Sequence, residues 1–325
     1  MSRTVLITGP ELAADAMNLA AAEGVRIIPT TPYLPADELQ AIIQAEQPDA
    51  IIVRQGQLTR AMIGASAKLK VIAKHGVGYN TIDIQAAAER GVPVTIATGA
   101  NAQSVAEHAF ALMFSVARQT ALLDARMRAG HWDKATANGI ELSGKTLGLI
   151  GLGSIGSILM DLVAPLRMTV KVYDPYLKEL PQRAHVEREE YLDRLLADCD
   201  VISLHCPLTD SNHHLIGAPQ LARMRPNSII INTARGELID TIALVEALRE
   251  DKIAGAGLDP FSPEPPPADS PLWGLTNLVA TPHIGANTSQ ARDRVGQVAL
   301  RQILDVCNSI ALDPRCVVNR HLLDN

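Results

Sequence analysis

The feature that most constrains the fold of this chain is a glycine-rich segment between a strand-like run and a helix-like run. Thr146-Leu-Gly-Leu-Ile150 has the pattern of a buried strand, and Gly151-Leu-Gly153-Ser-Ile-Gly156 follows it directly. From Ile155 to Leu166, apolar residues then recur at helical spacing. A strand that turns through glycines into a helix is typical of a parallel βαβ unit, so the segment predicts an α/β domain.

The glycines Gly151, Gly153 and Gly156 predict a dinucleotide site. Such glycines permit a tight turn, close approach of a pyrophosphate, and close packing of helix on strand. The next strand ends at Asp174, 18 residues after Gly156, where a carboxylate would hold a ribose 2′-hydroxyl. A carboxylate would repel the 2′-phosphate of NADP, so NAD is the expected cofactor. The alternative interpretation is that Asp174 only forms a turn before Pro175.

Strand and helix patterns alternate along the whole chain and predict two successive units with parallel, doubly wound sheets. The expected strands are Thr4–Thr8, Val25–Pro29, Ala50–Arg54, Val71–Lys74, Val94–Ala97, Thr146–Ile150, Val170–Asp174, Val201–His205, Ile229–Asn232 and Leu278–Thr281. The main expected helices are Leu12–Glu23, Ala36–Gln47, Ile82–Arg90, Asn101–Ala129 and Ser289–Asn308. Ser104-Val-Ala-Glu107 has the form of a capping box at the start of the fourth helix.

Composition excludes several classes of protein. The net charge is −6 and there is no basic stripe, so a nucleic-acid partner is not expected. The chain contains no run of about 18 apolar residues, so no membrane span is predicted. The N-terminal apolar run is too short for a signal peptide. The four cysteines form no C-x-x-C pair, which favours reduced thiols in a cytoplasmic protein. His213-His214 has no ligand partner at metal-binding spacing, so no metal is expected.

Three further polar segments lie in the second predicted unit. They are Ile231–Asp240, Gly257–Pro265 and Thr281–Ala286. Taken singly, each has an ordinary interpretation: Arg235 as a surface ion pair, Glu264 as a solvated loop acid, and His283 as a hydrogen-bonded turn residue.

Together with the glycine-rich segment, these motifs resemble the D-isomer-specific 2-hydroxyacid dehydrogenase family. The resemblance covers almost the whole chain. It includes Ala50–Arg54, His75-Gly-Val-Gly78, Asn101–Glu107 and the stretch from Glu141 to His283. The resemblance implies a flavodoxin-like substrate domain made of residues 1–100 and 287–325, a Rossmann NAD-binding domain at 101–286, and an active site in the cleft between them. It also implies a homodimer.

The resemblance further implies hydride transfer between a nicotinamide and a small D-2-hydroxy or 2-oxo acid. A histidine, here His283, suits delivery of a proton to the substrate oxygen near neutral pH. Glu264 would stabilise the imidazolium form, and Arg235 would offer forked donors to the substrate carboxylate and carbonyl. These three residues are the expected catalytic centre.

The remaining site residues also come from the resemblance. Expected cofactor contacts, besides the three glycines and Asp174, are Ser154, Ile155, Cys206, Pro207, Thr233, Ala234, Asp259, Gly285 and Ala286. Expected substrate contacts are Arg54 and the amides of Val77 and Gly78, although the glycines of that loop also suit a plain turn.

Two alternatives stay open. C-terminal-binding-protein corepressors share these motifs, so a sensor of NAD(H) is possible in place of an enzyme. Formate dehydrogenases have Gln beside the histidine, and Glu264 argues against that activity. The substrate is undecided between a phosphoglycerate type, which Lys74 favours, and a hydroxypyruvate or glyoxylate type, because Gln55 and Tyr79 depart from the phosphoglycerate pattern.

Overall fold

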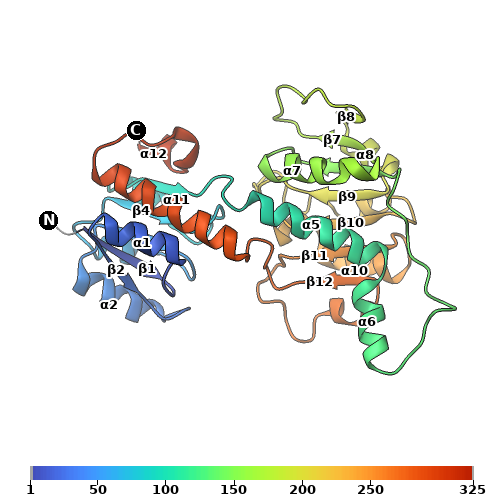
Figure 1. The fold of residues 1–325 in the computed structure, drawn as a ribbon, viewed down its shortest axis with the longest axis horizontal. Coiled ribbons are helices and arrows are strands. Elements are labelled where there is room, and N and C mark those ends of the chain that lie inside the picture. Colours follow the sequence, from blue (N-terminus) through green and yellow to red (C-terminus); the bar gives the residue numbers. More distant parts are fainter. Residues whose placement is uncertain (1–2, 324–325) are drawn as a thin grey trace. The chain divides into compact units, whose positions relative to one another are not determined.

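The computed structural model describes residues 3–323 and divides into two compact units (Figure 1). Unit 1 consists of Met1–Asn101 together with Asn287–Asn325, and unit 2 consists of Ala102–Ala286. The chain therefore leaves unit 1, completes unit 2, and returns.

Unit 1 contains a five-stranded parallel sheet in the order β2-β1-β3-β4-β5. Its strands are β1 (Arg3–Thr8), β2 (Val25–Pro29), β3 (Ala50–Val53), β4 (Val71–Lys74) and β5 (Val94–Ile96). Its helices are α1 (Ala14–Ala22), α2 (Ala36–Glu46), α3 (Arg60–Gly64), α4 (Ile84–Ala88), α11 (Ser289–Cys307) and α12 (Arg320–Leu323), with the 3-10 turn η4 (Pro314–Cys316). This strand order is that of flavodoxin-like folds.

Unit 2 contains a seven-stranded parallel sheet in the order β12-β11-β10-β9-β6-β7-β8. Its strands are β6 (Thr146–Ile150), β7 (Thr169–Tyr173), β8 (Val186–Arg188), β9 (Val201–Leu204), β10 (Ile229–Asn232), β11 (Gly255–Leu258) and β12 (Leu278–Ala280). Its helices are α5 (Ala102–Ala117), α6 (Thr120–Arg128), α7 (Ser154–Val163), α8 (Leu192–Asp198), α9 (Ala218–Leu221) and α10 (Thr241–Arg249), with the 3-10 turns η1 (Ala164–Leu166), η2 (Gly236–Leu238) and η3 (Pro271–Gly274). The order β8-β7-β6-β9-β10-β11 is that of a Rossmann sheet. The prediction of two doubly wound parallel sheets is confirmed.

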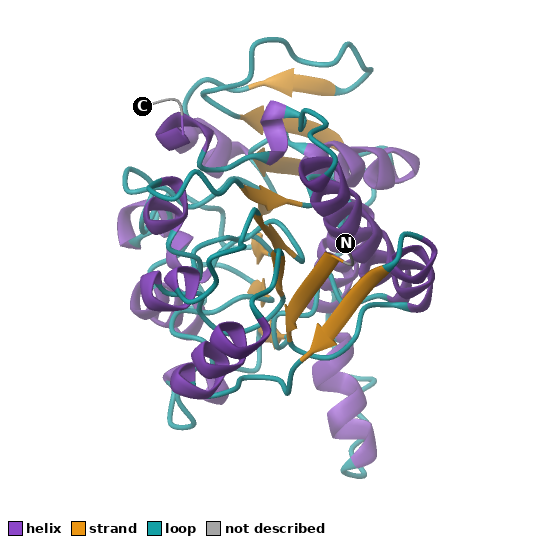
Figure 2. Ribbon diagram, turned by 90° about the vertical axis from the view of Figure 1, so that its left-hand side faces the viewer, coloured by secondary structure: helices purple, strands orange, loops and turns teal. Residues whose placement is uncertain are grey.

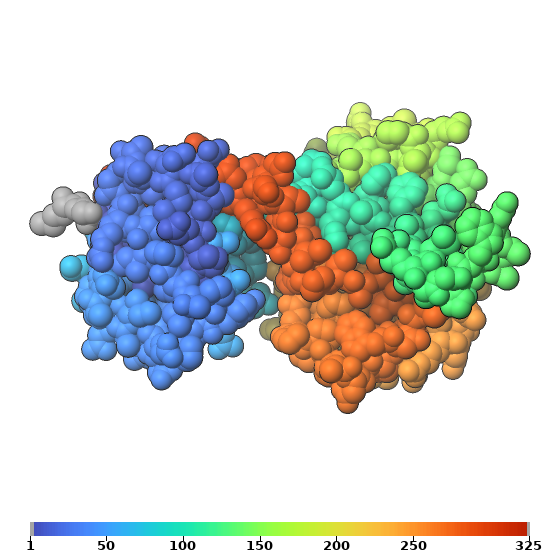
Figure 3. Space-filling view, turned by 60° about the horizontal axis from the view of Figure 1, so that its bottom comes forward, coloured from blue at the N-terminus to red at the C-terminus, as the bar shows by residue number. Residues whose placement is uncertain are grey.

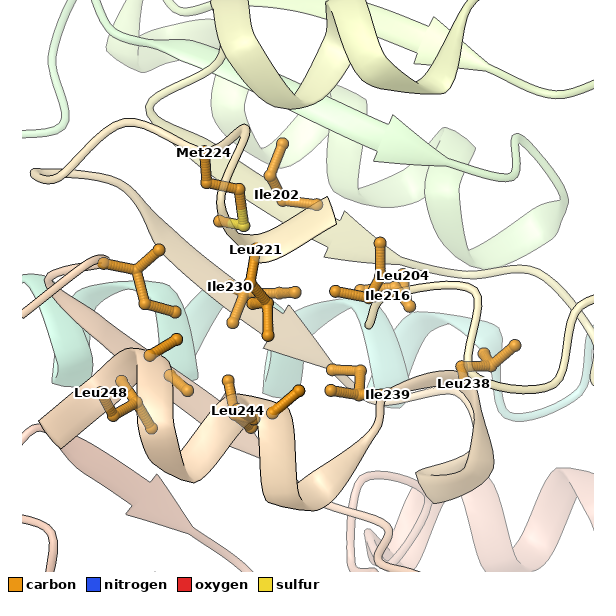
Figure 4. Close-up of a cluster of buried hydrophobic side chains, with 14 of the residues drawn as sticks. Ile202, Leu204, Ile216, Leu221, Met224, Ile230, Leu238, Ile239, Leu244 and Leu248 are labelled. Carbon is orange, nitrogen blue, oxygen red and sulfur yellow. The ribbon is translucent and has the colours of Figure 1, made fainter. Parts of the chain in front are cut away.

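Successive residues of each central strand belong to two different hydrophobic clusters. On β10, Ile230 packs with α8, α9 and α10, whereas Ile229 and Ile231 pack with α5 and α7. This alternation is the period of a strand with helices on both faces. Figure 4 shows the first cluster, in which Leu221 and Leu244 lie near Ile230. Helices lie on both sides of the strands in Figure 2.

Unit 1 is completed by the returning helix α11. Ala299, Leu300 and Ile303 of this helix are fully buried in one cluster with Val5 and Ile7 of β1. Farther along, Asn319 is buried, and its side chain accepts from Val94 N and donates to Val92 O. The sheet face built by residues 3–97 is therefore covered by a segment almost two hundred residues later.

The predicted helix Asn101–Ala129 was wrong in one respect, because the structure contains two helices there. α5 ends at Ala117, and Gln119 adopts a left-handed conformation (φ 52°) before α6 begins. The predicted capping box was also wrong. Ser104 is a buried residue inside α5 and not at its start, and Glu107 accepts a hydrogen bond from Gln103. The structure also contains α3, α8, α9, α10, β8 and β11, which the pattern analysis did not identify as elements.

Within residues 3–323, none of the helices has both the length and the apolar character needed to cross a lipid bilayer.

Candidate active site

Three adjacent strands of unit 2 deliver the polar segments to one edge of the sheet. β10, β11 and β12 are parallel neighbours, so their carboxyl ends share an edge. The segment with Arg235 follows β10, the segment with Glu264 follows β11, and the segment with His283 follows β12. Ligands of open α/β sheets bind outside this edge.

His283 and Glu264 form a hydrogen-bonded pair. The imidazole Nδ1 lies 2.9 Å from Glu264 Oε2, and Glu264 Oε1 accepts from Phe261 N at 3.0 Å. A carboxylate can only accept, so Nδ1 carries the hydrogen and Nε2 points away from the pair. The two side chains are 52% and 40% exposed, so solvent or a ligand can reach them.

The turn around His283 is fixed by the carboxylate of Asp259, which is 1% exposed. Its oxygens accept from Ile284 N and Gly285 N, both at 2.8 Å, and from the Thr281 hydroxyl at 2.6 Å. Burial alone opposes ionisation of Asp259, but hydrogen bonds from His108, Thr281 and these amides outweigh it and lower its pKa to about 2. Asp259 is therefore a charged anchor for the loop that carries His283.

Arg235 sits on a loop that other residues hold in place. The Asn232 side chain donates to Arg235 O and accepts from Ala234 N. The next residue, Gly236, lies so close to the backbone of Phe261 that a Cβ atom would overlap the Phe261 carbonyl. The guanidinium donates to Ala234 O at 2.6 Å. It forms no ion pair within residues 3–323, which leaves donors for an anion.

The glycine-rich loop Gly151–Gly156 shows the three spatial requirements expected of a dinucleotide site. Gly151 has φ 95°, and a Cβ there would lie 2.8 Å from Cys206 N. A Cβ on Gly156 would lie 2.6 Å from Gly151 O, so this residue permits the helix to approach the turn. A Cβ on Gly153, by contrast, would meet nothing within 4 Å, so space for a ligand is open at this position. Ser154 and Ile155 begin α7 directly after it.

Asp174 follows β7 and contacts the same loop. One carboxylate oxygen accepts from Leu152 N at 3.0 Å, and the other accepts from Tyr176 N at 2.9 Å. The carboxylate therefore lies beside the glycine-rich loop, as a ribose ligand must, and also forms the turn that the alternative interpretation predicted. Nearer the centre of the sheet edge, the hydroxyl of Thr233 is buried and has no hydrogen-bond partner among residues 3–323. An unsatisfied buried hydroxyl on the same sheet edge as the open glycine loop fits a polar cofactor.

Other expected cofactor residues lie on the same edge. Cys206 and Pro207 follow β9, and burial raises the pKa of the Cys206 thiol to about 11, so this thiol is uncharged at neutral pH. Ala234 lies between Thr233 and Arg235, and Gly285 and Ala286 end the His283 loop.

Arg54, Val77 and Gly78, the expected substrate residues, all belong to unit 1. Arg54 directly follows β3, and its Nη1 donates to Pro10 O and Glu11 O at 2.6 and 2.7 Å. Burial and the positive charge of Arg292 lower the pKa of Arg54. The loop before Val77 contains His75, whose pKa is lowered to about 4, chiefly by burial and then by Arg54.

Sequence reasoning missed His108 and the roles of Thr281 and Asn232. The His108 Nε2 lies 2.9 Å from Thr281 Oγ1 and 3.3 Å from Asp259 Oδ1. A single histidine inside a helix carries no sequence signal of such a contact, because its partners follow strands more than 150 residues away.

A comparison with family models decides the affiliation of the chain. Residues 110–285 match the model described as "D-isomer specific 2-hydroxyacid dehydrogenase, NAD binding domain". The chain belongs to this family. The matched residues lie within unit 2, and the cofactor expected from the sequence, NAD, is confirmed.

Individual relatives agree with this assignment. The chain is 41% identical over 304 residues to a D-3-phosphoglycerate dehydrogenase of Methanocaldococcus jannaschii, covering 93% of this chain and 57% of that protein. It is 43% identical over 272 residues to a hydroxypyruvate reductase of Thermotoga maritima, covering 82% and 87%. The chain spans about half the length of the phosphoglycerate dehydrogenases it matches. Among solved structures, the TT0316 protein of Thermus thermophilus superposes with a TM-score of 0.88 at 35% identity, covering 97% and 99%.

Proposed function

We propose that this chain is an NAD-dependent dehydrogenase that interconverts a small D-2-hydroxy acid and the corresponding 2-oxo acid. The observation that carries the proposal is the hydrogen bond between His283 and Glu264 on the edge of an NAD-binding sheet. An imidazole held by a carboxylate, with its second nitrogen free to reach a ligand, is suited to moving one proton at a time.

The residues of the chain would divide the reduction between them. When bound, NADH supplies a hydride for the carbonyl carbon of the 2-oxo acid. His283 donates the Nε2 proton to the carbonyl oxygen, and Glu264 stabilises the charged imidazole before that proton leaves. The imidazole is left neutral and regains a proton from solvent, so one 2-oxo acid, one NADH and one proton give one 2-hydroxy acid and one NAD⁺.

We propose that Arg235 binds the substrate carboxylate and polarises the carbonyl. Its planar guanidinium matches the geometry of a carboxylate, and no acid of residues 3–323 neutralises it. Arg54 and the amides of Val77 and Gly78 are proposed as further substrate ligands. Asp174 is proposed to hold the ribose hydroxyls of NAD, which its place beside Leu152 supports.

The experiment is a test of turnover with a panel of 2-oxo acids. The wild-type protein should oxidise NADH with hydroxypyruvate, glyoxylate, pyruvate or 3-phosphohydroxypyruvate, followed by loss of absorbance. The variant His283→Gln should lose at least about a hundredfold in kcat, because general acid catalysis contributes about that much or more. NADH binding, measured by fluorescence, should stay within a few-fold of wild type. Normal turnover in His283→Gln would refute the assignment.

The same panel identifies the substrate. The named relatives include phosphoglycerate dehydrogenases, a hydroxypyruvate reductase and a glyoxylate reductase, so a phosphorylated and an unphosphorylated acid are both candidates. The ratio of kcat/KM for 3-phosphohydroxypyruvate to that for hydroxypyruvate discriminates between them.

We also propose that the protein is a homodimer. α6 buries none of its residues, although it includes Met127, which is 52% exposed, and Trp132 shortly after it is 75% exposed. This segment, green in Figure 3, lies at the outer surface of unit 2. Exposed apolar side chains of this size on one segment are typical of an interface with a second copy. The expected cytoplasmic location stays a prediction.

A further inference from the structure

We propose that His108 is a positioning residue for His283, acting through Thr281 and Asp259. This inference rests on the proposed function, since it assigns a role to His108 in the same proton transfer. His108 lies on α5, far from the active-site loops in sequence, and its side chain is 19% exposed.

The geometry of His108, Thr281 and Asp259 shows which of these groups donates each hydrogen bond and which accepts it. The hydroxyl proton of Thr281 is directed at Asp259 Oδ1, at a distance of 2.6 Å. Thr281 Oγ1 can then only accept from a third group, and His108 Nε2 lies 2.9 Å from it. The His108 ring therefore carries a hydrogen on Nε2. The same nitrogen lies 3.3 Å from Asp259 Oδ1, so this N–H is shared between the two oxygens.

The three side chains together define the turn that carries His283. Asp259 binds the amides of Ile284 and Gly285, the two residues after His283, and its backbone carbonyl accepts from His283 N at 3.0 Å. His283 itself has φ 51°, in the left-handed region that non-glycine residues seldom adopt. A backbone in this region persists only where its surroundings hold it.

His108 thus supplies a donor to an anchor that lies almost entirely out of solvent. Removing that donor leaves the Thr281 hydroxyl one partner short and leaves Asp259 with fewer hydrogen bonds to its charge. The turn can then adopt a second conformation, in which the Thr281 side chain rotates and His283 shifts relative to Glu264. A displacement of about 1 Å at a catalytic group is enough to cost up to about a hundredfold in rate.

The test compares His108→Asn with His108→Gln. The amide nitrogen of Gln extends about as far as Nε2 of histidine and keeps a donor near Thr281, whereas the shorter Asn does not. We expect His108→Asn to lose about tenfold or more in kcat per NADH-binding site. His108→Gln should stay within about threefold of wild type, and NADH affinity should change little in either variant. His185→Asn, which places the same substitution on an exposed loop of unit 2, is the matched control and should behave as wild type.

A second variant keeps the test decisive if His108→Asn folds poorly. Thr281→Val removes the hydroxyl that links His108 to Asp259, so it should reproduce the loss of kcat. The double variant His108→Asn, Thr281→Val should lose no more kcat than the more impaired single variant, because both substitutions break the same chain of hydrogen bonds from His108 to Asp259. Counting sites by NADH titration separates a slower active site from a smaller folded fraction.

The possible outcomes distinguish the two proposals. If wild type is inactive on every 2-oxo acid, the proposed function fails. If wild type is active and His283→Gln is not, but His108→Asn is normal, only the positioning role is overturned. Equal losses in His108→Gln and His108→Asn would also overturn it, since the retained donor would then have no effect.

Discussion

His205 is held without charge inside unit 2. Burial lowers its pKa to about 4, its Nε2 lies 2.8 Å from Ser203 Oγ, and its Nδ1 is buried with no partner among residues 3–323. His205 follows β9, and its backbone carbonyl lies beside Gly151 of the glycine-rich loop. A charged ring at this position would need a partner that the described chain does not offer.

We predict that unit 2 loses stability as the pH falls from about 6.5 to about 4. In the unfolded chain the imidazole takes up a proton near pH 6.5, while in the folded chain it stays neutral until about pH 4. The unfolded state therefore binds more protons in this range, so stability is full above pH 6.5 and is lost as the pH falls. The loss attributable to His205 is of the order of 3 kcal/mol at pH 4.

The measurement is urea unfolding of wild type and His205→Gln across this pH range. The variant, which cannot gain a proton, should show a shallower decline in the free energy of unfolding. His131→Gln, on an exposed residue of the same unit, serves as the control and should leave the wild-type slope unchanged. Parallel slopes in wild type and His205→Gln would contradict the prediction.

At the scale of elements, the contact between the loops after β10 and β11 requires a residue without a Cβ atom, because the two backbones approach closely. Gly236 packs against the backbone of Phe261, three residues before Glu264. We predict that Gly236→Ala lowers the free energy of unfolding by about 1–3 kcal/mol, the usual cost of overpacking. It should also reduce kcat, since the loop with Glu264 must move away.

Thermal unfolding and turnover of Gly236→Ala check this expectation. Gly274→Ala is the matched control, because a Cβ there would meet nothing within 4 Å. The control should retain wild-type stability and rate. Gly236→Ala with unchanged stability would show that the two loops separate freely.

The sequence predicted the central strands closely because buried parallel strands are apolar runs with sharp ends. β2, β4, β6 and β10 match the expected bounds residue for residue. The helix break at Gln119 was not predictable from pattern, because neither Gly nor Pro marks it and the apolar spacing continues into α6. β11 was missed because its sequence, Gly255-Ala-Gly-Leu258, lacks the β-branched and aromatic residues typical of strands.

Some residues of the candidate site could likewise be identified from the sequence, and others could not. Arg235, Glu264 and His283 could be singled out from the sequence because each lies in a motif of the family that the chain resembles, and the structure pairs Glu264 with His283. His108 was not, since its significance depends on which helix face meets the turn after β12. Asp259 was predicted as a cofactor ligand, and its contacts to Ile284 and Gly285 add a role in holding the loop that no spacing indicates.

At the scale of the whole molecule, unit 2 is continuous in sequence and unit 1 is not. We predict that residues 102–286 expressed alone fold cooperatively and bind NADH, because both of their hydrophobic clusters are internal. Residues 1–101 alone should not fold, because they lack α11, which covers Val5 and Ile7. Circular dichroism and NADH fluorescence of the two fragments measure this. A cooperative transition in the 1–101 fragment would contradict the prediction.

The late return of α11 also affects how the chain is made. Synthesis proceeds from the N-terminus at roughly 5–20 residues per second, so all of unit 2 leaves the ribosome before α11 does. Throughout that interval one face of the sheet that contains β1 lacks the helix that completes its apolar cover. The nascent protein thus spends seconds with unit 2 already outside the ribosome while the apolar sheet face of unit 1 is only partly covered.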